Sequence, residues 1–408
     1  MIGGFNINNI YEISKNIYWV GGNDRRIERF ENMFPLPNGV AYNSYLINDE
    51  KTALLDTVDT AISAEFIENI KHALDGKPLD YLVINHMEPD HCANIEQILR
   101  HYPQTKVIGN AKTFQFFNQY YNMDISENCI EVKDGHEISL GEHSLRFYTA
   151  PMVHWPEVMV TYEINKGILF SADAFGAFGA ISGNIFADQL EYDSYYLDEA
   201  RRYYTNIVGR YGSQVQALFR KLAGLEINMI CSLHGHIWRG DMIPYIMDKY
   251  DKWSKYIPEK KGVVLAYASM YGNTEDAVNG LAQRLAKKGV EDIRMYDVSK
   301  THASYIISDI FKYSNIVFAS PTYNLQLYFP MDSLIRELAS LNICNRKVSL
   351  IGNHTWSSAA LRYMTEMVNG MKNMEIVGAP MDIKSSLKDD RVHELDTLAE
   401  DIYKSLKD

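Results

Sequence analysis

The stretch that decides the fold is His86-Met-Glu-Pro-Asp-His91, in which four side chains able to bind a metal fall within six positions. In extended backbone, alternate side chains point the same way, so His86, Glu88 and Asp90 line one side of this loop while His91 points differently. A single histidine or aspartate is more often a surface charge or a helix cap. Four of them this close together favour a metal site, and their two orientations allow one loop to serve two metals.

Four apolar runs of strand length each lead into a potential metal ligand. The pairs are Tyr81-Leu-Val-Ile84 with His86, Leu145-Arg-Phe-Tyr148 with His154, Gly167-Ile-Leu-Phe170 with Asp173, and Ile227-Asn-Met-Ile230 with His234. Many sites are built from side chains gathered at strand ends in an α/β structure. We therefore expect His154, Asp173 and His234 to join the loop of residues 86–91. His236 is a competing candidate for the last position.

A change of composition marks a domain boundary at residues 256–262, Tyr-Ile-Pro-Glu-Lys-Lys-Gly. This polar stretch carries Pro and Gly and follows a predicted helix over residues 242–256. It precedes Val263-Val-Leu-Ala-Tyr-Ala268, a continuous apolar run of buried-strand length. We therefore predict an N-terminal domain over residues 1–256 and a C-terminal domain over residues 262–408.

The C-terminal domain opens with an anion-binding pattern. Its first strand is followed by Ser269-Met-Tyr-Gly-Asn-Thr274 and then by a predicted helix over residues 275–288. At such a helix start, backbone N–H groups and the helix dipole face a phosphate, and the hydroxyls of Ser269 and Thr274 add further donors. No lysine follows Gly272, so the spacing is not that of a nucleoside triphosphate loop.

Two later loops complete the pattern of a doubly wound sheet, in which loops at the carboxyl ends of successive strands meet at the ligand crevice. They lie in Ile316-Val-Phe-Ala-Ser-Pro-Thr-Tyr-Asn-Leu325 and Val348-Ser-Leu-Ile-Gly-Asn-His-Thr-Trp-Ser-Ser-Ala359. The loop of residues 269–274 resembles the phosphate loop of flavodoxins, (S/T)x(T/Y)GNT. The two later loops resemble the flavodoxin loops that hold the isoalloxazine ring.

The flavodoxin resemblance implies FMN as a cofactor. The residues implied to bind it are Ser269, Met270, Tyr271, Gly272, Asn273, Thr274, Ser320, Pro321, Thr322, Tyr323, Asn324, Asn353, His354, Thr355, Trp356 and Ser357. Either Tyr323 or Trp356 could stack on the ring, and each could instead cover the sheet edge. The sequence has no GxGxxG fingerprint, so a bound nicotinamide cofactor has no support.

Composition excludes several classes of protein. A chain of 408 residues with 46% hydrophobic and 23% charged residues is an ordinary globular protein of two or three domains, which excludes a disordered chain, a coiled coil and a collagen-like repeat. The formal charge of −12 repels phosphate backbones, so nucleic acid is an unexpected partner.

The spacing of the cysteines and the length of the apolar runs indicate the cellular compartment that we expect for the protein. Cys92, Cys129, Cys231 and Cys344 form no CxxC pair, so neither a disulfide framework nor a thiolate metal site is expected. The N-terminus lacks the basic and apolar segments of a signal peptide, and no apolar run reaches the length of a membrane span. We expect a cytoplasmic protein with no membrane partner.

Around the metal motif, the sequence resembles the flavodiiron proteins (A-type flavoproteins), a family of rubredoxin:oxygen oxidoreductases and nitric oxide reductases. The matching motifs are Ser44-Tyr-Leu-Ile47, Leu55-Asp-Thr-Val58, Asn85-His-Met-Glu-Pro-Asp-His91, Pro151-Met-Val-His-Trp-Pro156, Asp173-Ala-Phe-Gly176 and Ser232-Leu-His-Gly-His236. The resemblance covers essentially the whole chain. It implies an α/β fold with an N-terminal metallo-β-lactamase-like αββα sandwich and a C-terminal flavodoxin-like doubly wound parallel sheet.

The resemblance also implies a complete set of ligands for two irons. The first iron takes His86, Glu88, His154 and Asp173, and the second takes Asp90, His91 and His234, with Asp173 bridging the two. His236 is then expected to have a structural role. Tyr203 and Tyr204 match a pair of residues in the family that could approach the site, although core packing explains either of them equally well.

Glu88 distinguishes this pattern from the zinc hydrolases of the same superfamily. Those enzymes typically have HxHxDH, and Glu88 stands where they have the second histidine. A hard anionic oxygen ligand suits iron better than an all-imidazole triad does. The alternatives are a zinc hydrolase with an appended flavodoxin module and an electron-transfer flavoprotein whose metal site is only structural. The segment Asn23-Asp-Arg-Arg-Ile-Glu-Arg-Phe-Glu31 departs from the family pattern near the substrate pocket.

The family resemblance implies the reaction and the partners. It implies reduction of dioxygen to water, or of nitric oxide to nitrous oxide, with electrons relayed through FMN to the irons. The chain ends at Asp408 without CxxC pairs, so we expect a separate electron donor, either rubredoxin or reduced deazaflavin. Domain dimensions separate the two centres of one chain by roughly 30 Å or more. We therefore expect a head-to-tail homodimer, which brings the flavin of one chain to the irons of the other.

Overall fold

The computed structural model describes residues 8–407, which divide into two compact units. The first unit contains the chain up to Tyr204 together with Ser213–Tyr250. The second contains Thr205–Gly212 and Asp251–Asp408. The boundary that we predict from the sequence at residues 256–262 falls a few residues after the point at which the contacts divide.

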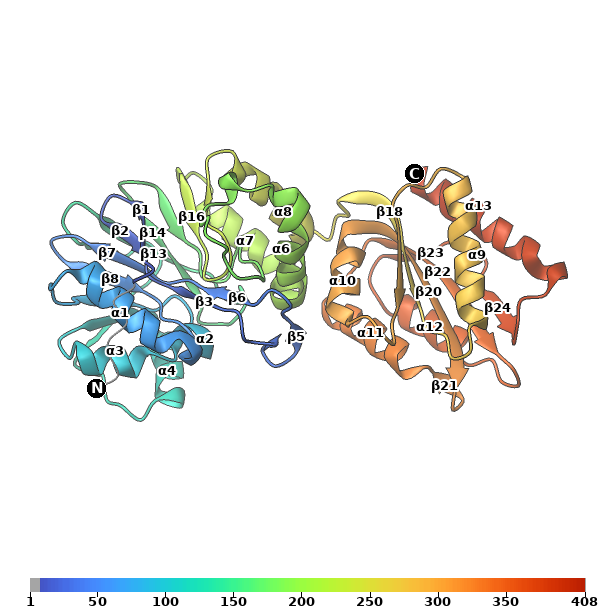
Figure 1. The fold of residues 1–408 in the computed structure, drawn as a ribbon, viewed down its shortest axis with the longest axis horizontal. Helices are drawn as coiled ribbons and strands as arrows, with labels where there is room; N and C mark the ends of the chain where they lie inside the picture. The colour runs from blue at the N-terminus through green and yellow to red at the C-terminus, as the bar shows by residue number, and fades with distance from the viewer. Residues whose placement is uncertain (1–7, 408) are drawn as a thin grey trace. The chain divides into compact units, whose positions relative to one another are not determined.

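The first large sheet of the first unit has seven strands, and Figure 1 shows them in blue and cyan with helices gathered beside them. Its order is β1 (Tyr11–Ser14), β2 (Ile17–Trp19), β7 (Tyr45–Asn48), β8 (Thr52–Leu55), β9 (Tyr81–Val83), β10 (Lys106–Gly109) and β11 (Cys129–Glu131). Pairing is antiparallel as far as β8 and parallel from β8 onward. The helices of this half are α1 (Ser63–Leu74), α2 (Pro89–Cys92), α3 (Ile95–His101) and α4 (Ala111–Tyr120).

The second large sheet of the first unit has six strands. They are β12 (Glu137–Ser139), β13 (Ser144–Thr149), β14 (Met159–Glu163), β15 (Ile168–Phe170), β16 (Met229–Cys231) and β17 (Trp238–Arg239), in that order. The neighbouring helices are α5 (Tyr192–Tyr195), α6 (Leu197–Tyr203), α7 (Gly212–Leu222) and α8 (Met242–Ser254). Two small ribbons pair β3 (Gly22–Asp24) with β6 (Val40–Tyr42), and β4 (Arg29–Phe30) with β5 (Phe34–Pro35).

The two large sheets enclose one apolar core. Tyr45, Leu55 and Val83 come from the first sheet, and Phe147 and Phe170 come from the second; all five are buried in a single cluster. Alternate side chains of a strand point to opposite faces, so each sheet turns one apolar face inward. The predicted sandwich of two sheets with helices outside is confirmed.

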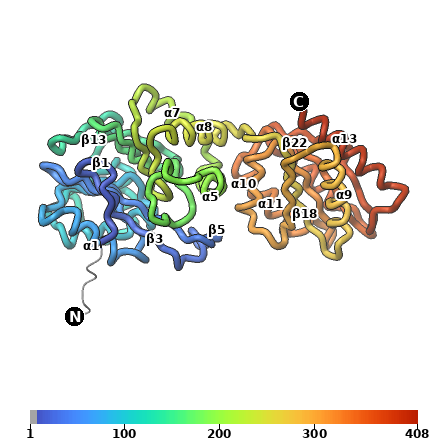
Figure 2. Tube along the Cα trace, turned by 45° about the horizontal axis from the view of Figure 1, so that its top comes forward, coloured from blue at the N-terminus to red at the C-terminus, as the bar shows by residue number. Residues whose placement is uncertain are grey.

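The second unit is a parallel sheet with helices on both faces. Its order is β19 (Ile293–Asp297), β18 (Lys260–Tyr267), β20 (Tyr313–Tyr323), β22 (Arg346–His354) and β23 (Met374–Ile376), with β24 (Met381–Lys384) also on β22 and β21 (Gln326–Leu327) on β20. The helices are α9 (Asn273–Lys287), α10 (Ala303–Lys312), α11 (Phe329–Ser340), α12 (Ala360–Asn369) and α13 (Val392–Lys407). Figures 1 and 2 both show α9 on one side of β18 and α10 with α11 on the other.

The strand order of this sheet, with the chain running outward in both directions from β18, is that of a doubly wound fold. Val263 and Leu265 of β18 face a core cluster shared with Leu281 of α9 and Leu398 of α13. The predicted flavodoxin-like sheet is confirmed. Its loops at the carboxyl ends of β18, β20 and β22 are the three loops that we selected from the sequence.

A buried arginine ties the connecting segment to the second unit. Arg346 is 1% exposed, and its guanidinium donates hydrogen bonds to the carbonyl oxygens of Ile310 and Phe311 at 2.7 and 2.8 Å and of Tyr256 at 2.7 Å. Burial lowers the pKa of Arg346 to about 9. The carbonyls at the end of α10, which have no partner within their own helix, thus receive donors.

Within residues 8–407, no helix is both long and apolar enough to cross a membrane.

Candidate functional site

The loop after β9 carries the first ligand candidates in a fixed backbone. The buried carboxylate of Asp56 accepts hydrogen bonds from the backbone N–H of Asn85 at 2.7 Å and of His86 at 3.1 Å. Pro89 then starts the short helix α2, which suits its missing N–H. Because the backbone becomes helical at α2, the alternation of an extended loop ends there, and Asp90 groups with His91 instead of sharing a side with His86 and Glu88 as the sequence predicted. The local sequence thus separates two sets of ligands.

Three further loops bring the remaining candidates to the same place. His154 lies between β13 and β14, Asp173 follows β15, and His234 follows β16. All three side chains are buried. The second sheet therefore presents its candidates to those that the first sheet presents at residues 86–91, as the sequence predicts.

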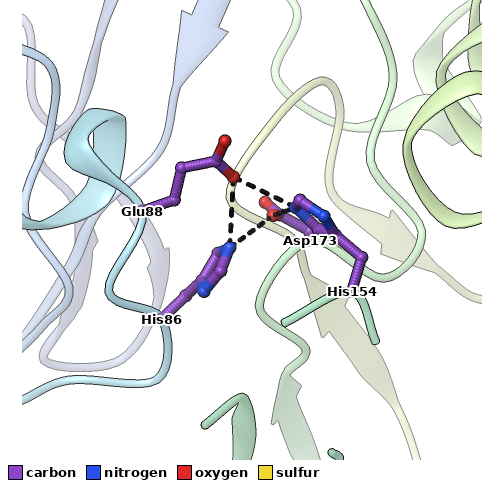
Figure 3. Close-up of side chains that lie close together, drawn as sticks. All are labelled: His86, Glu88, His154 and Asp173. Atoms are coloured by element: carbon purple, nitrogen blue, oxygen red, sulfur yellow. Dashed lines mark hydrogen bonds and ion pairs between the residues drawn. The ribbon is translucent and has the colours of Figure 1, made fainter. Parts of the chain in front are cut away.

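The first group of side chains is shown in Figure 3. The Nε2 atom of His86 lies 3.2 Å from Glu88 Oε2 and 3.2 Å from Asp173 Oδ2. The Nε2 atom of His154 lies 3.0 Å from the same glutamate oxygen and 3.1 Å from the same aspartate oxygen. Two imidazoles and two carboxylates thus converge on one point from three different loops.

The second group contains Asp90, His91 and His234. The Nε2 atoms of the two histidines face each other at 3.0 Å, and each lies 3.3 Å from Asp90 Oδ2. Asp173 joins this group through its other oxygen, because Oδ1 lies 3.2 Å from His91 Nε2 and 3.6 Å from His234 Nε2. One carboxylate therefore offers one oxygen to each group.

The hydrogen bonds of these side chains fit a pair of metal ions. Within residues 8–407, both carboxylate oxygens of Asp90 and the Oδ1 atom of Asp173 are buried without a hydrogen-bond partner. His234 Nδ1 donates to the carbonyl oxygen of Ala41 at 2.9 Å, which leaves its Nε2 lone pair directed into the group. Ligand atoms about 2 Å from a common ion lie roughly 3 Å apart, close to the separations observed here.

Glu157 is a functional candidate that the sequence did not reveal. Its Oε1 accepts hydrogen bonds from His86 Nδ1 at 2.7 Å and from the backbone N–H of Met87 at 2.9 Å. A carboxylate behind a histidine fixes the ring and its tautomer and strengthens it as a metal ligand. In the sequence, Glu157 is marked only by directly following Trp155-Pro156 of the His154 motif. A residue there belongs to no periodic pattern that would predict its role.

The buried carboxylates of the site stabilise positive charge near them. Burial lowers the pKa of His86, but Asp173, Glu157 and Glu88 outweigh burial and hold that pKa well above its ordinary value. Burial raises the pKa of Glu88, but the hydrogen bonds from His154 and His86 lower it below its ordinary value. In the absence of a metal, protons on imidazole neutralise the carboxylates, and cations at the same points would do so when bound.

A small cavity of about 300 Å³ opens onto Glu88 and Asp90. The β4–β5 hairpin forms one wall, and Glu31 lies at the tip of this hairpin in the left-handed backbone region (φ 50°). Burial and the adjacent Glu88 carboxylate raise the pKa of Glu31 to about 8. Glu31 ends the segment that departs from the family pattern, so this departure places an additional carboxyl group beside the ligands.

The aromatic candidates have different environments. The ring of Tyr203 lies 5.4 Å from that of His234, and its hydroxyl is buried without a hydrogen-bond partner in the described part of the chain. Tyr204 packs on Tyr250 at 4.8 Å instead. His236 lies outside both metal groups, with its ring 4.7 Å from that of Tyr196. Of these residues, only Tyr203 approaches the ligands.

The second unit contains a larger cavity of about 570 Å³ at the carboxyl ends of its strands. Fourteen of the sixteen residues that we selected for cofactor binding line it, all except Gly272 and Ser320. Gly272 precedes α9 with a φ of 93°, and Ser320 is fully buried in β20. The cavity also includes Leu325 and Ser385, which the sequence did not indicate. Ser385 follows β24, a strand too short to predict from its pattern.

The anion end of this cavity lies at the start of α9. Ser269 Oγ accepts a hydrogen bond from the backbone N–H of Gly272 at 3.1 Å, which holds the loop in a tight turn. Thr274 is 2% exposed, and its hydroxyl accepts a hydrogen bond from Asn353 Nδ2 at 3.2 Å. The helix start with its free N–H groups is suited to a phosphate.

Aromatic side chains surround the opposite end. At that end Trp356 is 86% exposed and Tyr323 is 38% exposed, whereas Tyr271, which is 90% exposed, belongs to the loop before α9. Such exposure of large apolar rings is unusual on a soluble surface unless a ligand or a partner covers them. The rings of Tyr323 and Trp356 both border the cavity, so each has access to a planar ligand.

Two family models match the chain. The model of the ODP family beta lactamase matches residues 40–235, and the flavodoxin model matches residues 265–397. The first range includes all seven candidate metal ligands, and the second includes the three loops of the larger cavity.

Several relatives match most of the chain. The chain is 32% identical over 362 residues to an uncharacterized protein of Methanocaldococcus jannaschii, covering 89% of this chain and 90% of that protein. It is 29% identical over 354 residues to the anaerobic nitric oxide reductase flavorubredoxin of Escherichia coli, covering 86% of this chain and 73% of that protein. The structure of rubredoxin oxygen:oxidoreductase from Desulfovibrio gigas superposes with a TM-score of 0.91 at 28% identity, covering 98% of this chain and 99% of that chain.

Proposed function

Because the chain belongs to the flavodiiron protein family, we propose that it reduces dioxygen to water at a non-haem diiron site with electrons relayed through FMN. It is an oxidoreductase, as its relatives are. The proposal extends this assignment to a substrate, to two cofactors and to the residues that hold them.

The observation that carries the proposal is the position of Asp173 between the two ligand groups. Its Oδ2 faces His86 and His154, and its Oδ1 faces His91 and His234. A carboxylate that is shared in this way holds two metals close together, as reactions that use both metals at once require. A single structural metal would occupy only one of the two ligand groups and would not explain the other.

We assign iron to both groups, with His86, Glu88, His154 and Asp173 holding one ion, and Asp90, His91, His234 and the shared Asp173 holding the other. Oxygen and imidazole donors in this ratio suit iron, whereas the zinc hydrolase alternative lacks a reason for Glu88 in place of histidine. Bound FMN carries two electrons and a ferrous pair carries two more, which together match the four electrons needed to convert one dioxygen to two waters.

The chain's own residues prepare the site for a small substrate. The cavity of about 300 Å³ opens onto Glu88 and Asp90 and is large enough for dioxygen or nitric oxide to reach the ligands from that side. Phe30 and Tyr42 place their rings 5.2 and 5.8 Å from that of His234 and restrict water. The hydroxyl of Tyr203 supplies a buried donor beside His234.

We assign FMN to the cavity of about 570 Å³. The phosphate would lie at the start of α9, with the hydroxyls of Ser269 and Thr274 nearby. The ring would lie between the loops at residues 320–324 and 353–357, with Tyr323 or Trp356 against its face. In this proposal the role of the second unit is to hold the flavin and transfer electrons.

Nitric oxide is the second candidate substrate, because the Escherichia coli relative is named as a nitric oxide reductase. Protein reduced without oxygen is to be mixed in parallel with dioxygen and with nitric oxide, and the consumption of each gas followed together with flavin reoxidation. We expect dioxygen to be consumed with the higher kcat/KM. Faster consumption of nitric oxide would reverse the assignment of substrate, and consumption of neither would refute the proposed function.

Metal analysis of protein purified without added metal separates the reductase from the zinc hydrolase. We expect about two irons per chain with little zinc, by the ligand chemistry. Zinc in both groups, together with hydrolytic activity, would favour the alternative.

The donor and the assembly complete the proposal. We propose rubredoxin as the electron donor, with reduced deazaflavin as the alternative, because the Desulfovibrio gigas relative is named for rubredoxin. We also propose a cytoplasmic head-to-tail homodimer in which the flavin of one chain reduces the irons of its partner. After subunit exchange, a mixture of an Asn273→Ala/Thr274→Ala variant with an Asp90→Ala variant should recover partial activity. No recovery despite exchange would place the transfer within one chain.

A further inference from the structure

A series of oxidisable aromatic side chains leads from the metal ligands to the surface of the first unit. It starts at Phe175, two residues after the shared ligand Asp173. The indole Nε1 of Trp238 donates a hydrogen bond to the carbonyl oxygen of Phe175 at 2.9 Å, and the backbone N–H of Phe175 donates to the hydroxyl of Tyr250 at 2.6 Å. The backbone next to Asp173 is therefore in direct contact with a tryptophan and a tyrosine.

From Trp238 the series continues outward in short steps. The ring of Tyr192 lies 4.7 Å from that of Trp238, Tyr196 lies 5.6 Å from Tyr192, and Tyr195 lies 6.5 Å from Tyr196. Trp238 is fully buried, whereas Tyr195 is 72% exposed at the end of α5. No step exceeds the distance of ordinary ring packing, so the buried and exposed ends are electronically connected.

Packing alone does not explain tyrosine at position 192. Its side chain is 3% exposed, and its hydroxyl has no hydrogen-bond partner within residues 8–407. A buried hydroxyl without a partner costs about 1–3 kcal/mol, which phenylalanine would avoid at the same volume. Phenylalanine is much harder to oxidise than tyrosine, so the hydroxyl has a value for electron transfer that it lacks for packing.

We infer that Trp238, Tyr192, Tyr196 and Tyr195 form a path that supplies electrons to the metal site when the flavin cannot. The inference rests on the proposed function, because it takes dioxygen reduction as the source of the oxidising equivalents. The path protects the ligands, and the tyrosine rings packed on them such as Tyr203, from oxidation when reduction stops before four electrons have been delivered.

The electrons and protons of this step balance at the surface. Each missing electron comes from one phenol, as Tyr195 loses an electron to the path and a proton to water and becomes a neutral radical. Trp238 and Tyr192 pass the electron without losing their protons, because the Trp238 N–H stays bonded to the Phe175 carbonyl and the Tyr192 hydroxyl has no proton acceptor within residues 8–407. A small thiol then returns a hydrogen atom to Tyr195, and two thiyl radicals combine to a disulfide. The exposure of Tyr195 makes both exchanges accessible.

The first test limits the supply of electrons. Holoenzyme reduced by only two electrons per chain is mixed with dioxygen and a spin trap, and the radical is measured by freeze-quench EPR and located by peptide mass spectrometry. We expect a tyrosyl radical and an adduct at Tyr195. Enzyme that holds all four electrons should give neither. Oxygen uptake in the same samples reports the proposed function separately.

Two variants define the path, and a third is the control. Tyr195→Phe should lose the adduct at the surface, and Tyr192→Phe should lower its yield, with no change in oxygen uptake by fully reduced enzyme. Tyr120→Phe removes a tyrosine of α4 that is 47% exposed and outside the series, and it should behave as the parent. Oxygen uptake without an adduct on the series, or an unchanged yield in both path variants, would overturn the inference.

The second test needs neither iron nor dioxygen. A ruthenium photosensitiser attached to Arg239→Cys, in a Cys129→Ser background, oxidises the neighbouring Trp238 in metal-free protein. A tyrosyl radical should then form at Tyr195, and Tyr192→Phe should delay it. No tyrosyl radical in protein that has kept its fold would refute the path even if the protein does not consume oxygen. A radical in this test without oxygen uptake in the first would refute the proposed function and leave the path standing.

Discussion

The metal site and the flavin cavity are built in opposite ways. Each candidate metal ligand is at most 8% exposed, and ligand atoms from distant parts of the chain lie about 3 Å apart. The flavin cavity is open, and aromatic rings such as Trp356 at its rim are largely exposed. The first site is organised by buried side chains, and the second by backbone loops at the ends of parallel strands.

This difference determines how each site responds to change. Three carboxylates that are buried beside one another repel, so the metal site needs its cations for stability as well as for chemistry. The flavin cavity has no comparable concentration of charge, and its main anion contact is a helix start made of backbone. We therefore expect the loss of one side chain to be severe in the first unit and mild in the second.

The largest effect is expected from the shared ligand. Asp173→Ala removes an oxygen from both groups, so both metals should be lost and gas consumption should fall to background while FMN stays bound. Metal analysis and the flavin absorption spectrum measure the two outcomes. Asp188→Asn, which alters only an exposed ion pair with Arg239, is the control. Loss of FMN together with the metals would show that the two sites are not independent.

The second group of ligands allows a finer version of this experiment. Asp90→Ala or His91→Ala should empty one of the two positions and retain FMN, with activity lost. Retention of both metals in either variant would contradict the assignment of these side chains.

Removal of the metals should destabilise only the first unit. A ligand present at a thousand times its dissociation constant stabilises a fold by about 4 kcal/mol, and chelation removes that contribution. Calorimetry should show the transition of the first unit at a lower temperature after chelation, with flavin release unchanged. A common shift of both transitions would contradict the contrast between the units.

A substitution of Glu157 tests whether its hydrogen bond to His86 strengthens metal binding. Glu157→Gln weakens the hydrogen bond at His86 Nδ1 and should lower metal affinity by about 10- to 100-fold. The matched control is Glu163→Gln, because Glu163 Oε1 lies 3.0 Å from His143 Nδ1 in an equally buried pair away from the metals. The control should cost about 1–3 kcal/mol of folding free energy. Equal metal affinities in the two variants would show that the Glu157 contact is structural only.

The smallest effect is expected in the flavin loop. Ser269→Ala removes the acceptor for the Gly272 N–H but leaves the start of α9 in place. Loss of one hydrogen bond costs about 1 kcal/mol, so FMN should bind roughly five-fold more weakly, with a normal metal content. Fluorescence titration of flavin-free protein measures the change. A loss of binding by orders of magnitude would show that the serine, and not the backbone, dominates the phosphate site.

Much of the fold and of both sites could be predicted because their signals are local. The run His86–His91 concentrates its ligands in one loop, and each distant ligand follows an apolar run that the structure shows to be a strand or the end of one. The flavin loops combine a strand, small polar residues and a helix start. Gly272 and Ser320 were selected as parts of contiguous loops, although the backbone turns them away from the cavity wall.

Residues whose role depends on packing gave no such signal. Glu157 lies behind His86 only because the loop between β13 and β14 places it there, and an isolated glutamate in a loop has no pattern. Ser385 enters the flavin cavity from the end of β24, which pairs with β22. Glu31 reaches Glu88 because the β4–β5 hairpin folds over the ligands, which no periodicity in that segment indicates.

The sequence by itself indicated two units and a set of candidate metal-binding side chains, because apolar runs and potential ligands are neighbours along the chain, and its family resemblance indicated the class of each fold. Only the tertiary structure decided that Asp173 divides its two oxygens between the groups, that Glu157 orients His86, and that tyrosines extend from the site to the surface. These features join atoms that are far apart along the chain. Their positions follow from the way two sheets pack against each other, and local sequence does not encode that packing.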